Sequence, residues 1–263
     1  MEVAHGIGWS PTKISRAESG RGSIPPHEIA KLIDYYGVAG PLRAQLLSLA
    51  EDAVRQGWWE DYADVLAPEY SEFIGLEAEA ASVLSCHFEV VPGLLQTEEY
   101  ARQISLGYQR VIPVLPSEVE QVVRIRMIRQ ERLVREPVLH LSAIIDESVL
   151  LRNMGGPAVM RAQLEHLALM SEQFNVEIRV LPFSRNISLA VASFLVLRFG
   201  SRDAPASAGL GDVVSTESLR SDLCIEGEGD TYKYRLVHRA IADASLSPDE
   251  SRHFITNVAK DRY

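Results

Sequence analysis

The chain has 263 residues, of which 46% are hydrophobic and 24% are charged, and its formal net charge at pH 7 is −10. This composition is that of a globular protein with room for one large domain or two smaller ones, and the acidic balance argues against non-specific binding to nucleic acid. Because the sequence has no long apolar run and no basic-then-apolar leader, we expect a cytoplasmic protein without a membrane segment.

A short helix is predicted to begin at Ser10. Its hydroxyl can accept a hydrogen bond from a free N–H of the first turn, and Pro11 suits the first helical position. Ile14 and Ala17 are three residues apart and can face a core, and Gly20 ends the helix. The outward side chains are small, polar or basic, which is what the DNA major groove accepts. The expected DNA contacts are Arg16 and Lys13 to guanine edges or phosphates, Thr12 and Ser15 as shorter polar contacts, and Arg21 to the backbone.

The segment that would support this helix is short. Only residues 1–7 precede the turn, and they correspond to about two turns of helix. Gly6 and Gly8 also disfavour a helix, at about 1 kcal/mol for each glycine in a helix interior. We therefore expect either that the protein begins further upstream or that the DNA-binding module is reduced.

Two amphipathic helices are predicted after the loop at residues 23–26, the first ended by Gly37 and the second ending near Gly57. We accordingly divide the chain into a partial all-α domain, residues 1–56, and a second domain, residues 57–263. The apolar positions of the two helices are Ile29, Leu32, Ile33 and Tyr36, then Leu42, Leu46, Leu49 and Ala53.

An aromatic segment, Trp58, Trp59 and Tyr62, follows this boundary. Large aromatic side chains bury much area, so packing between the domains is the favoured interpretation. The alternative is a platform on which a ligand stacks.

The second domain begins with predicted helices over residues 71–86, from Thr97 onward, and over 116–135. The third contains Arg124, Arg126, Arg129, Arg132 and Arg135. Such a basic face either binds nucleic acid or an acidic partner, or pairs with carboxylates of the chain itself, which is the commoner case.

Strands are predicted next, over residues 138–145, 176–181, 192–199 and 211–216. Between the first two, Gly155-Gly156-Pro157 opens a helix whose apolar stripe comprises Met160, Leu164, Leu167, Met170 and Phe174. This strand–helix–strand order favours a parallel pair, with the later strands joined by tighter turns. Closing helices are expected over residues 232–243 and 248–260, with Ser247 as the N-cap of the second. The fold class is therefore α+β, an all-α helix-turn-helix remnant followed by a mixed α/β domain with a small, mostly central sheet.

The second domain shows no complete sequence motif for catalysis or for metal or cofactor binding. Cys86 and Cys224 lack metal-ligand spacing and are expected to be reduced thiols. The histidines form no metal-binding pair, and no phosphate-binding glycine loop occurs, so we expect neither metal nor cofactor. Asp146 and Glu147 follow a strand and, with Glu217, are the candidates for acid–base work, whereas the favoured alternative is a helix N-cap with a first-turn acid. Taken together, these sequence features argue against an enzymatic activity.

Several blocks occur in one order along nearly the whole chain. They include residues 8–16, 32–38, 57–59, 75–80, 91–102, 145–147, 155–156, 180–183 and 247–251. On these blocks the sequence resembles the actinobacterial Xre-type helix-turn-helix regulators that carry a large C-terminal domain of unknown function. It departs from them by lacking the first helix and part of the second. The resemblance implies an antitoxin-like regulator, and it implies a small acidic partner protein.

Two functions follow from these expectations. The first is a sequence-specific transcriptional regulator that binds double-stranded DNA as a homodimer and whose C-terminal domain binds an effector or partner. The alternative is a family member that no longer binds DNA and whose C-terminal domain binds or transforms a small molecule, for example as a biosynthetic cyclase.

Overall fold

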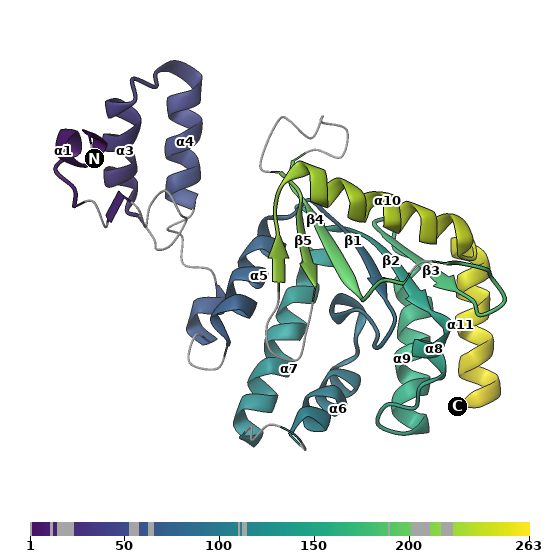
Figure 1. Cartoon of the computed structure of the whole chain (residues 1–263). Coiled ribbons are helices and arrows are strands. Elements are labelled where there is room, and N and C mark those ends of the chain that lie inside the picture. The colour runs from purple at the N-terminus through teal and green to yellow at the C-terminus, as the bar shows by residue number, and fades with distance from the viewer. Residues whose placement is uncertain are drawn as a thin grey trace. The chain divides into compact units, whose positions relative to one another are not determined.

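The computed structural model describes residues 2–10, 13–14, 24–52, 58–62, 66–109, 111, 115–188, 190–200, 211–216 and 223–263. By their internal contacts the residues group into two compact units, Met1–Glu60 and Asp61–Tyr263, which we name the N-terminal unit and the C-terminal unit (Figure 1). Within those described ranges, no helix is long and apolar enough to cross a membrane.

The described residues of the N-terminal unit are largely helical. They form α1 (Glu2–Ile7), α3 (Pro26–Tyr35) and α4 (Gly40–Asp52), and α3 contacts both of the other helices. Gly8 follows α1 at φ +72° and Gly37 follows α3 at φ +69°, a left-handed conformation that favours glycine. The predicted stop at Gly37 is thus confirmed.

The apolar faces predicted for α3 and α4 are only partly buried. Ile33 is buried, whereas Tyr36, Leu42 and Leu49 are exposed at 58%, 53% and 46%. Short helices that pack in pairs bury a narrow stripe, so residues at the margin of an amphipathic face stay in contact with solvent.

The C-terminal unit is an α+β domain built on one six-stranded sheet, as expected. The spatial order is β3-β2-β1-β4-β5-β6, with β1, β2 and β3 parallel and the remaining pairs antiparallel. The parallel pairing of β2 with β3 confirms the strand–helix–strand prediction. The strands are β1 (Ser82–His87), β2 (His140–Asp146), β3 (Val176–Leu181), β4 (Phe194–Arg198), β5 (Val213–Thr216) and β6 (Leu223–Ile225).

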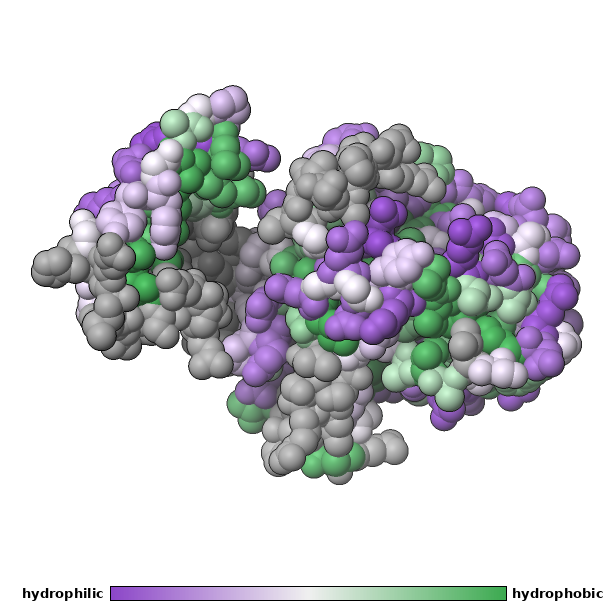
Figure 2. Space-filling view, turned by 45° about the horizontal axis from the view of Figure 1, so that its top comes forward, coloured by the Kyte–Doolittle hydropathy of each residue, from purple (hydrophilic) through white to green (hydrophobic). Residues whose placement is uncertain are grey.

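Helices cover both faces of this sheet. α10 crosses one face and α6, α7 and α9 lie on the other, while α11 packs along β3 and α9 (Figure 1). Figure 2 looks toward the side on which α10 lies, and hydrophilic residues cover much of it. The helices are α5 (Pro68–Glu79), α6 (Glu98–Tyr108), α7 (Pro116–Gln130), α8 (Glu147–Leu151), α9 (Pro157–Met170), α10 (Glu228–Ala244) and α11 (Pro248–Arg262), with 3₁₀ turns η2 (Gly93–Leu95) and η3 (Glu131–Leu133). A further 3₁₀ turn, η1 (Trp58–Tyr62), spans the sequence boundary between the two units.

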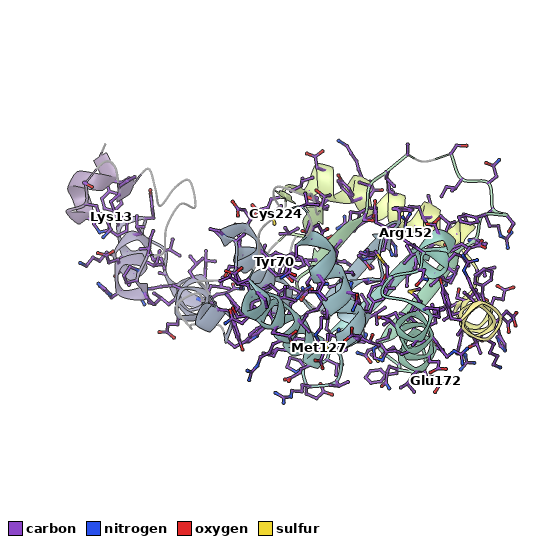
Figure 3. All side chains as sticks on the ribbon, turned by 90° about the horizontal axis from the view of Figure 1, so that it is seen from below. Lys13, Tyr70, Met127, Arg152, Glu172 and Cys224 are labelled. Atoms are coloured by element: carbon purple, nitrogen blue, oxygen red, sulfur yellow. The ribbon has the colours of Figure 1, made fainter. Side chains whose placement is uncertain are left out.

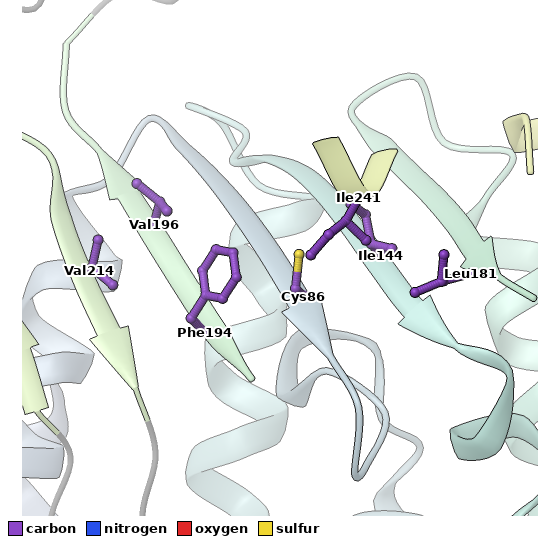
Figure 4. Close-up of a cluster of buried hydrophobic side chains, with 7 residues drawn as sticks. All are labelled: Cys86, Ile144, Leu181, Phe194, Val196, Val214 and Ile241. Atoms are coloured by element: carbon purple, nitrogen blue, oxygen red, sulfur yellow. The ribbon is translucent and has the colours of Figure 1, made fainter. Parts of the chain in front are cut away.

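The core beneath α10 comes from alternate residues of neighbouring strands. Strand register aligns Cys86 with Ile144 on one side and with Phe194 on the other, and Ile241 of α10 packs onto this row (Figure 4). Burying such side chains stabilises the fold by about 25 cal/mol per Å² of apolar area removed from water. The buried members are Cys86, Ile144, Leu181, Phe194, Val196, Val214 and Ile241.

Three sequence predictions need correction here. Residues 82–87 form β1 rather than the end of a helix over 71–86, since helix α5 ends at Glu79. The helix predicted over 116–135 ends at Gln130 and continues as the 3₁₀ turn η3. Phe174 is 81% exposed because α9 ends at Met170, so helical spacing no longer places Phe174 on the buried face. Strand β6 was not predicted.

Candidate nucleic-acid interface

The helix predicted at Ser10 begins where expected. The backbone N–H of Lys13 donates to the Ser10 hydroxyl at 3.2 Å and to the Ser10 carbonyl at 3.0 Å, and Ile14 donates to the same carbonyl at 3.2 Å. A side-chain oxygen that satisfies a first-turn N–H is the defining contact of an N-cap. The sequence prediction of this cap is therefore confirmed.

Helix α1, which contains Gly6, forms just before this turn and packs against α3. A Cβ on Gly6 would lie 2.2 Å from Cε2 of Tyr35, so the glycine allows the Tyr35 ring to lie against the backbone of α1. Trp9, immediately before the cap, is 9% exposed. Gly6 is thus a packing position between α1 and α3.

Lys13, labelled in Figure 3, forms an ion pair within the N-terminal unit. Its Nζ lies 2.6 Å from Oε1 and 2.5 Å from Oε2 of Glu28 on α3, and 4.5 Å from the centroid of the Trp9 ring. The hydrogen bond from Lys13 lowers the pKa of the Glu28 carboxyl below its ordinary value. Of the other predicted DNA contacts, Thr12, Ser15, Arg16 and Arg21 lie outside the described residues.

The aromatic segment is the 3₁₀ turn η1. Trp58, Trp59 and Tyr62 are all half-buried, and the two tryptophan rings meet edge to face with centroids 6.0 Å apart. This geometry is typical of aromatic packing. The structure brings Trp58 and Trp59 together, and the choice between packing and ligand stacking stays a prediction.

Asp146 and Glu147, the two acid–base candidates that the structure describes, accept hydrogen bonds from backbone N–H groups near the carboxyl ends of β2 and β3. Oδ1 of Asp146 accepts from the Ser148 N–H at 2.9 Å and from the Ser148 hydroxyl at 2.5 Å, which makes Asp146 the N-cap of α8. Oε2 of Glu147 accepts from the Phe183 N–H at 2.7 Å. Both carboxylates therefore have structural partners, and Glu217 lies outside the described residues.

Three of the four arginines of α7 and η3 bind groups of the C-terminal unit itself, and the fourth, Arg124, is exposed. Arg129 is paired with Glu77 through two 2.7 Å contacts, and Arg126 donates to Gln96 at 2.5 Å. Arg132 donates to the Ala80 carbonyl at 2.9 Å. These side chains pair with partners on α5 and neighbouring loops, so they do not form the basic face considered from the sequence.

Sequence reasoning missed a hollow of about 300 Å³ at the amino ends of the parallel strands. Its lining includes Ser82, His140, Glu177, Arg198 and the exposed Phe174, whose ring meets the imidazole of His140 edge to face with centroids 6.3 Å apart. No signal in the sequence indicated this hollow, because the sequence pattern placed Phe174 on the apolar stripe of a helix. The strand register that brings Ser82 beside His140 was not readable in advance.

The titratable groups of the sheet do not assemble a metal centre. In the described ranges, no three His, Cys, Asp or Glu side chains are grouped so as to hold an ion. Cys86 is a buried free thiol, and burial raises its pKa. Burial also lowers the pKa of His87 to about 4, and its Nε2 has no hydrogen-bond partner among the described residues.

Comparison with known protein families gives one match in each unit. Residues 1–46 match a helix-turn-helix domain, which suggests a DNA-binding regulator. Residues 70–257 match the family described as a domain of unknown function, DUF5753. No curated protein matches the chain. Since the second match covers well over half of the sequence, the chain belongs to the DUF5753 family and carries a helix-turn-helix domain at its N-terminus.

Proposed function

We propose that the protein is a sequence-specific, DNA-binding transcriptional regulator of the Xre type. The observation that carries the proposal is the helix capped by Ser10 within the region that matches a helix-turn-helix domain. In this proposal residues 1–56 bind double-stranded DNA, and residues 57–263 bind an effector or partner. The helix lies in the major groove, where Arg16, Thr12 and Ser15 face the bases and Arg21 binds the backbone.

A homodimer is the form that we propose for DNA binding. The basic residues of the first forty positions, Lys13, Arg16, Arg21 and Lys31, are balanced by Glu2, Glu18, Glu28 and Asp34. A nearly neutral module of this size binds weakly alone, and two linked copies gain affinity by engaging two half-sites. The family resemblance adds a small acidic protein as a proposed partner of the C-terminal domain, in an antitoxin-like arrangement.

The test is fluorescence anisotropy of the purified chain with DNA fragments enriched from its own genome, measured over a salt series. We expect tight binding to an enriched site with a steep salt dependence. Arg16→Ala should weaken that binding about tenfold or more, as for loss of a bidentate base contact. The matched control is Arg124→Ala, which removes the same charge from an exposed position on α7. Equal affinity of the two variants would overturn the docking of this helix.

A second candidate function rests on the hollow at the amino ends of β1 to β3. We propose that a small molecule with an aromatic ring and an anionic group binds there, because Phe174 offers a ring and Arg198 a cation. This candidate corresponds to the family member that binds or transforms a small molecule instead of DNA. An anilinonaphthalene sulfonate dye has both chemical features and serves as the probe.

Dye fluorescence should fall several-fold with Phe174→Ala relative to the unchanged chain, as expected when an aromatic contact is lost. Phe183→Ala is the matched control, since Phe183 is 62% exposed and absent from the lining of the hollow. The same fluorescence from both variants would contradict binding in the hollow.

A further inference from the structure

The contact between Lys13 and Glu28 joins two helical segments across 15 residues of sequence. Lys13 lies in the helix capped by Ser10, and Glu28 lies in the first turn of α3. The ammonium group reaches both carboxylate oxygens and lies over the Trp9 ring. The side chain of Lys13 therefore contacts both Trp9, just before the cap, and Glu28 on α3.

This contact differs from an ordinary surface ion pair. The Glu28 side chain is 18% exposed and Lys13 is 41% exposed, whereas the nearby pair of Arg43 and Asp34 is exposed at 40% and 59%. Partial removal from water strengthens a charge-assisted hydrogen bond, while fully solvated pairs contribute little. The N-terminal position of Glu28 also suits its negative charge, since the helix dipole is positive there.

A lysine held in this way is poorly placed to act as a DNA contact. To bind a phosphate, its ammonium would have to leave both the carboxylate and the aromatic ring, and the half-buried Glu28 would lose its partner. The free energy lost when Glu28 has no partner offsets the free energy gained from a solvated phosphate contact.

We propose that Lys13 is a positioning residue rather than a DNA contact: it ties the helix capped by Ser10 to α3 and so sets the orientation in which that helix meets DNA. The inference rests on the proposed function, and it reassigns one of the residues first expected to touch DNA. It makes Glu28, an acidic residue, a requirement for binding a polyanion.

The decisive variant is Glu28→Gln, assayed by DNA anisotropy in the full chain. If Lys13 contacts DNA, removing the acid frees the lysine and tightens binding. If Lys13 is a positioning residue, the same variant weakens binding, by about tenfold for loss of one charge-assisted hydrogen bond. Asp34→Asn is the matched control, because it removes the same charge from the exposed pair with Arg43 and should not weaken binding.

The salt dependence provides a second readout. Loss of a phosphate contact lowers the slope of log affinity against log salt by about 1. Lys13→Met should therefore weaken binding without changing the slope. The charge swap Lys13→Glu with Glu28→Lys should recover most of the lost affinity, although it places an acid on the helix that meets DNA. Circular dichroism of each variant establishes that the protein is folded.

The outcomes separate the inference from the proposed function. If the unchanged chain binds no enriched DNA, the proposed function fails and the inference fails with it. If the unchanged chain binds but Glu28→Gln binds more tightly, or Lys13→Met lowers the slope by about 1, only the positioning role is overturned. If Lys13→Met does not fold, the charge swap decides: unrecovered affinity in a folded swap variant overturns the inference.

Discussion

The N-terminal unit and the C-terminal unit are each stabilised internally, but by different kinds of contact. Among the described residues of the N-terminal unit, Trp9 and Ile33 are the only buried hydrophobic side chains, while Leu42 and Leu49 of α4 are exposed. Figure 2 shows hydrophobic surface on this unit. The C-terminal unit instead has a continuous core on its sheet, with residues such as Phe194 and Ile144 almost fully buried. Local contacts, namely caps, glycine turns and one partly buried ion pair, therefore matter more in the N-terminal unit.

Polar groups are also used differently in the two units. In the C-terminal unit, Arg129 and Glu77 form a bidentate pair with side-chain exposures of 6% and 3%, and Tyr70 accepts a further hydrogen bond from Arg129 at 2.5 Å. In the N-terminal unit the pair of Lys13 and Glu28 is half open to solvent. A large core can bury a complete ion pair, whereas a small unit keeps its pairs near the surface.

The largest effect should come from removing one partner of the buried pair. Glu77→Gln leaves the Arg129 cation in a nearly dry site, and the free energy of unfolding of the C-terminal unit should fall by about 3 to 5 kcal/mol. Urea denaturation followed by circular dichroism measures it. The control is Glu131→Gln, at an exposed pair with Arg135, which should cost less than about 1 kcal/mol. Equal losses would show that burial does not distinguish the two pairs.

Acid should weaken the C-terminal unit through its buried histidines. The folded pKa of His87 is about 4, lowered by burial from an ordinary 6.5. Between these values the unfolded chain takes up a proton that the folded chain does not, so this stability is complete above pH 6.5 and is lost as pH falls toward 4. A shift of this size corresponds to about 3 kcal/mol.

Urea titrations at several pH values test this effect. The loss between pH 6.5 and 4 should be smaller in His87→Gln than in the unchanged chain. It should not vanish, because burial also lowers the pKa of His166 and His238. His253→Gln is the control at an exposed position and should keep the original dependence. An unaltered dependence in His87→Gln would mean that His87 is not the source.

Local signals in the sequence predicted much of this structure. Thr97 caps α6 by accepting from the Tyr100 N–H at 3.3 Å, and Ser247 caps α11, each as its residue type indicates. Strand β3 was predicted at its observed bounds, because apolar and charged residues alternate along Val176–Leu181, and the two charged positions are the half-buried ones. Caps and alternation depend on neighbours within a few residues, and the sequence states those neighbours directly.

Contacts between distant segments were not predictable in this way. Strand β1 is central and flanked by β2 and β4, so its sequence lacks a clear alternation, and the preceding alanines favour a helix. Arg129 pairs with a carboxylate 52 residues away, and Lys13 pairs with Glu28 15 residues away. A single sequence records that an arginine or lysine is present, but its partner is set by the tertiary fold.

The smallest predicted effect compares the two units directly, because a serine caps a helix in each of them. Ser10→Ala and Ser247→Ala each remove a hydroxyl that accepts from a first-turn N–H, and each should cost about 1 kcal/mol. The C-terminal unit has a large core, so the same loss is a small fraction of its stability. Ser247→Ala should therefore lower its unfolding midpoint by about 2 to 4 °C. In the N-terminal unit the same loss is a large fraction of a small stability. Hydrogen exchange of the amides in α1 and α3 should therefore accelerate about fivefold in Ser10→Ala while amides of the sheet keep their rates. Equal protection of α1 and α3 in both variants would show that the N-terminal unit does not depend on its caps.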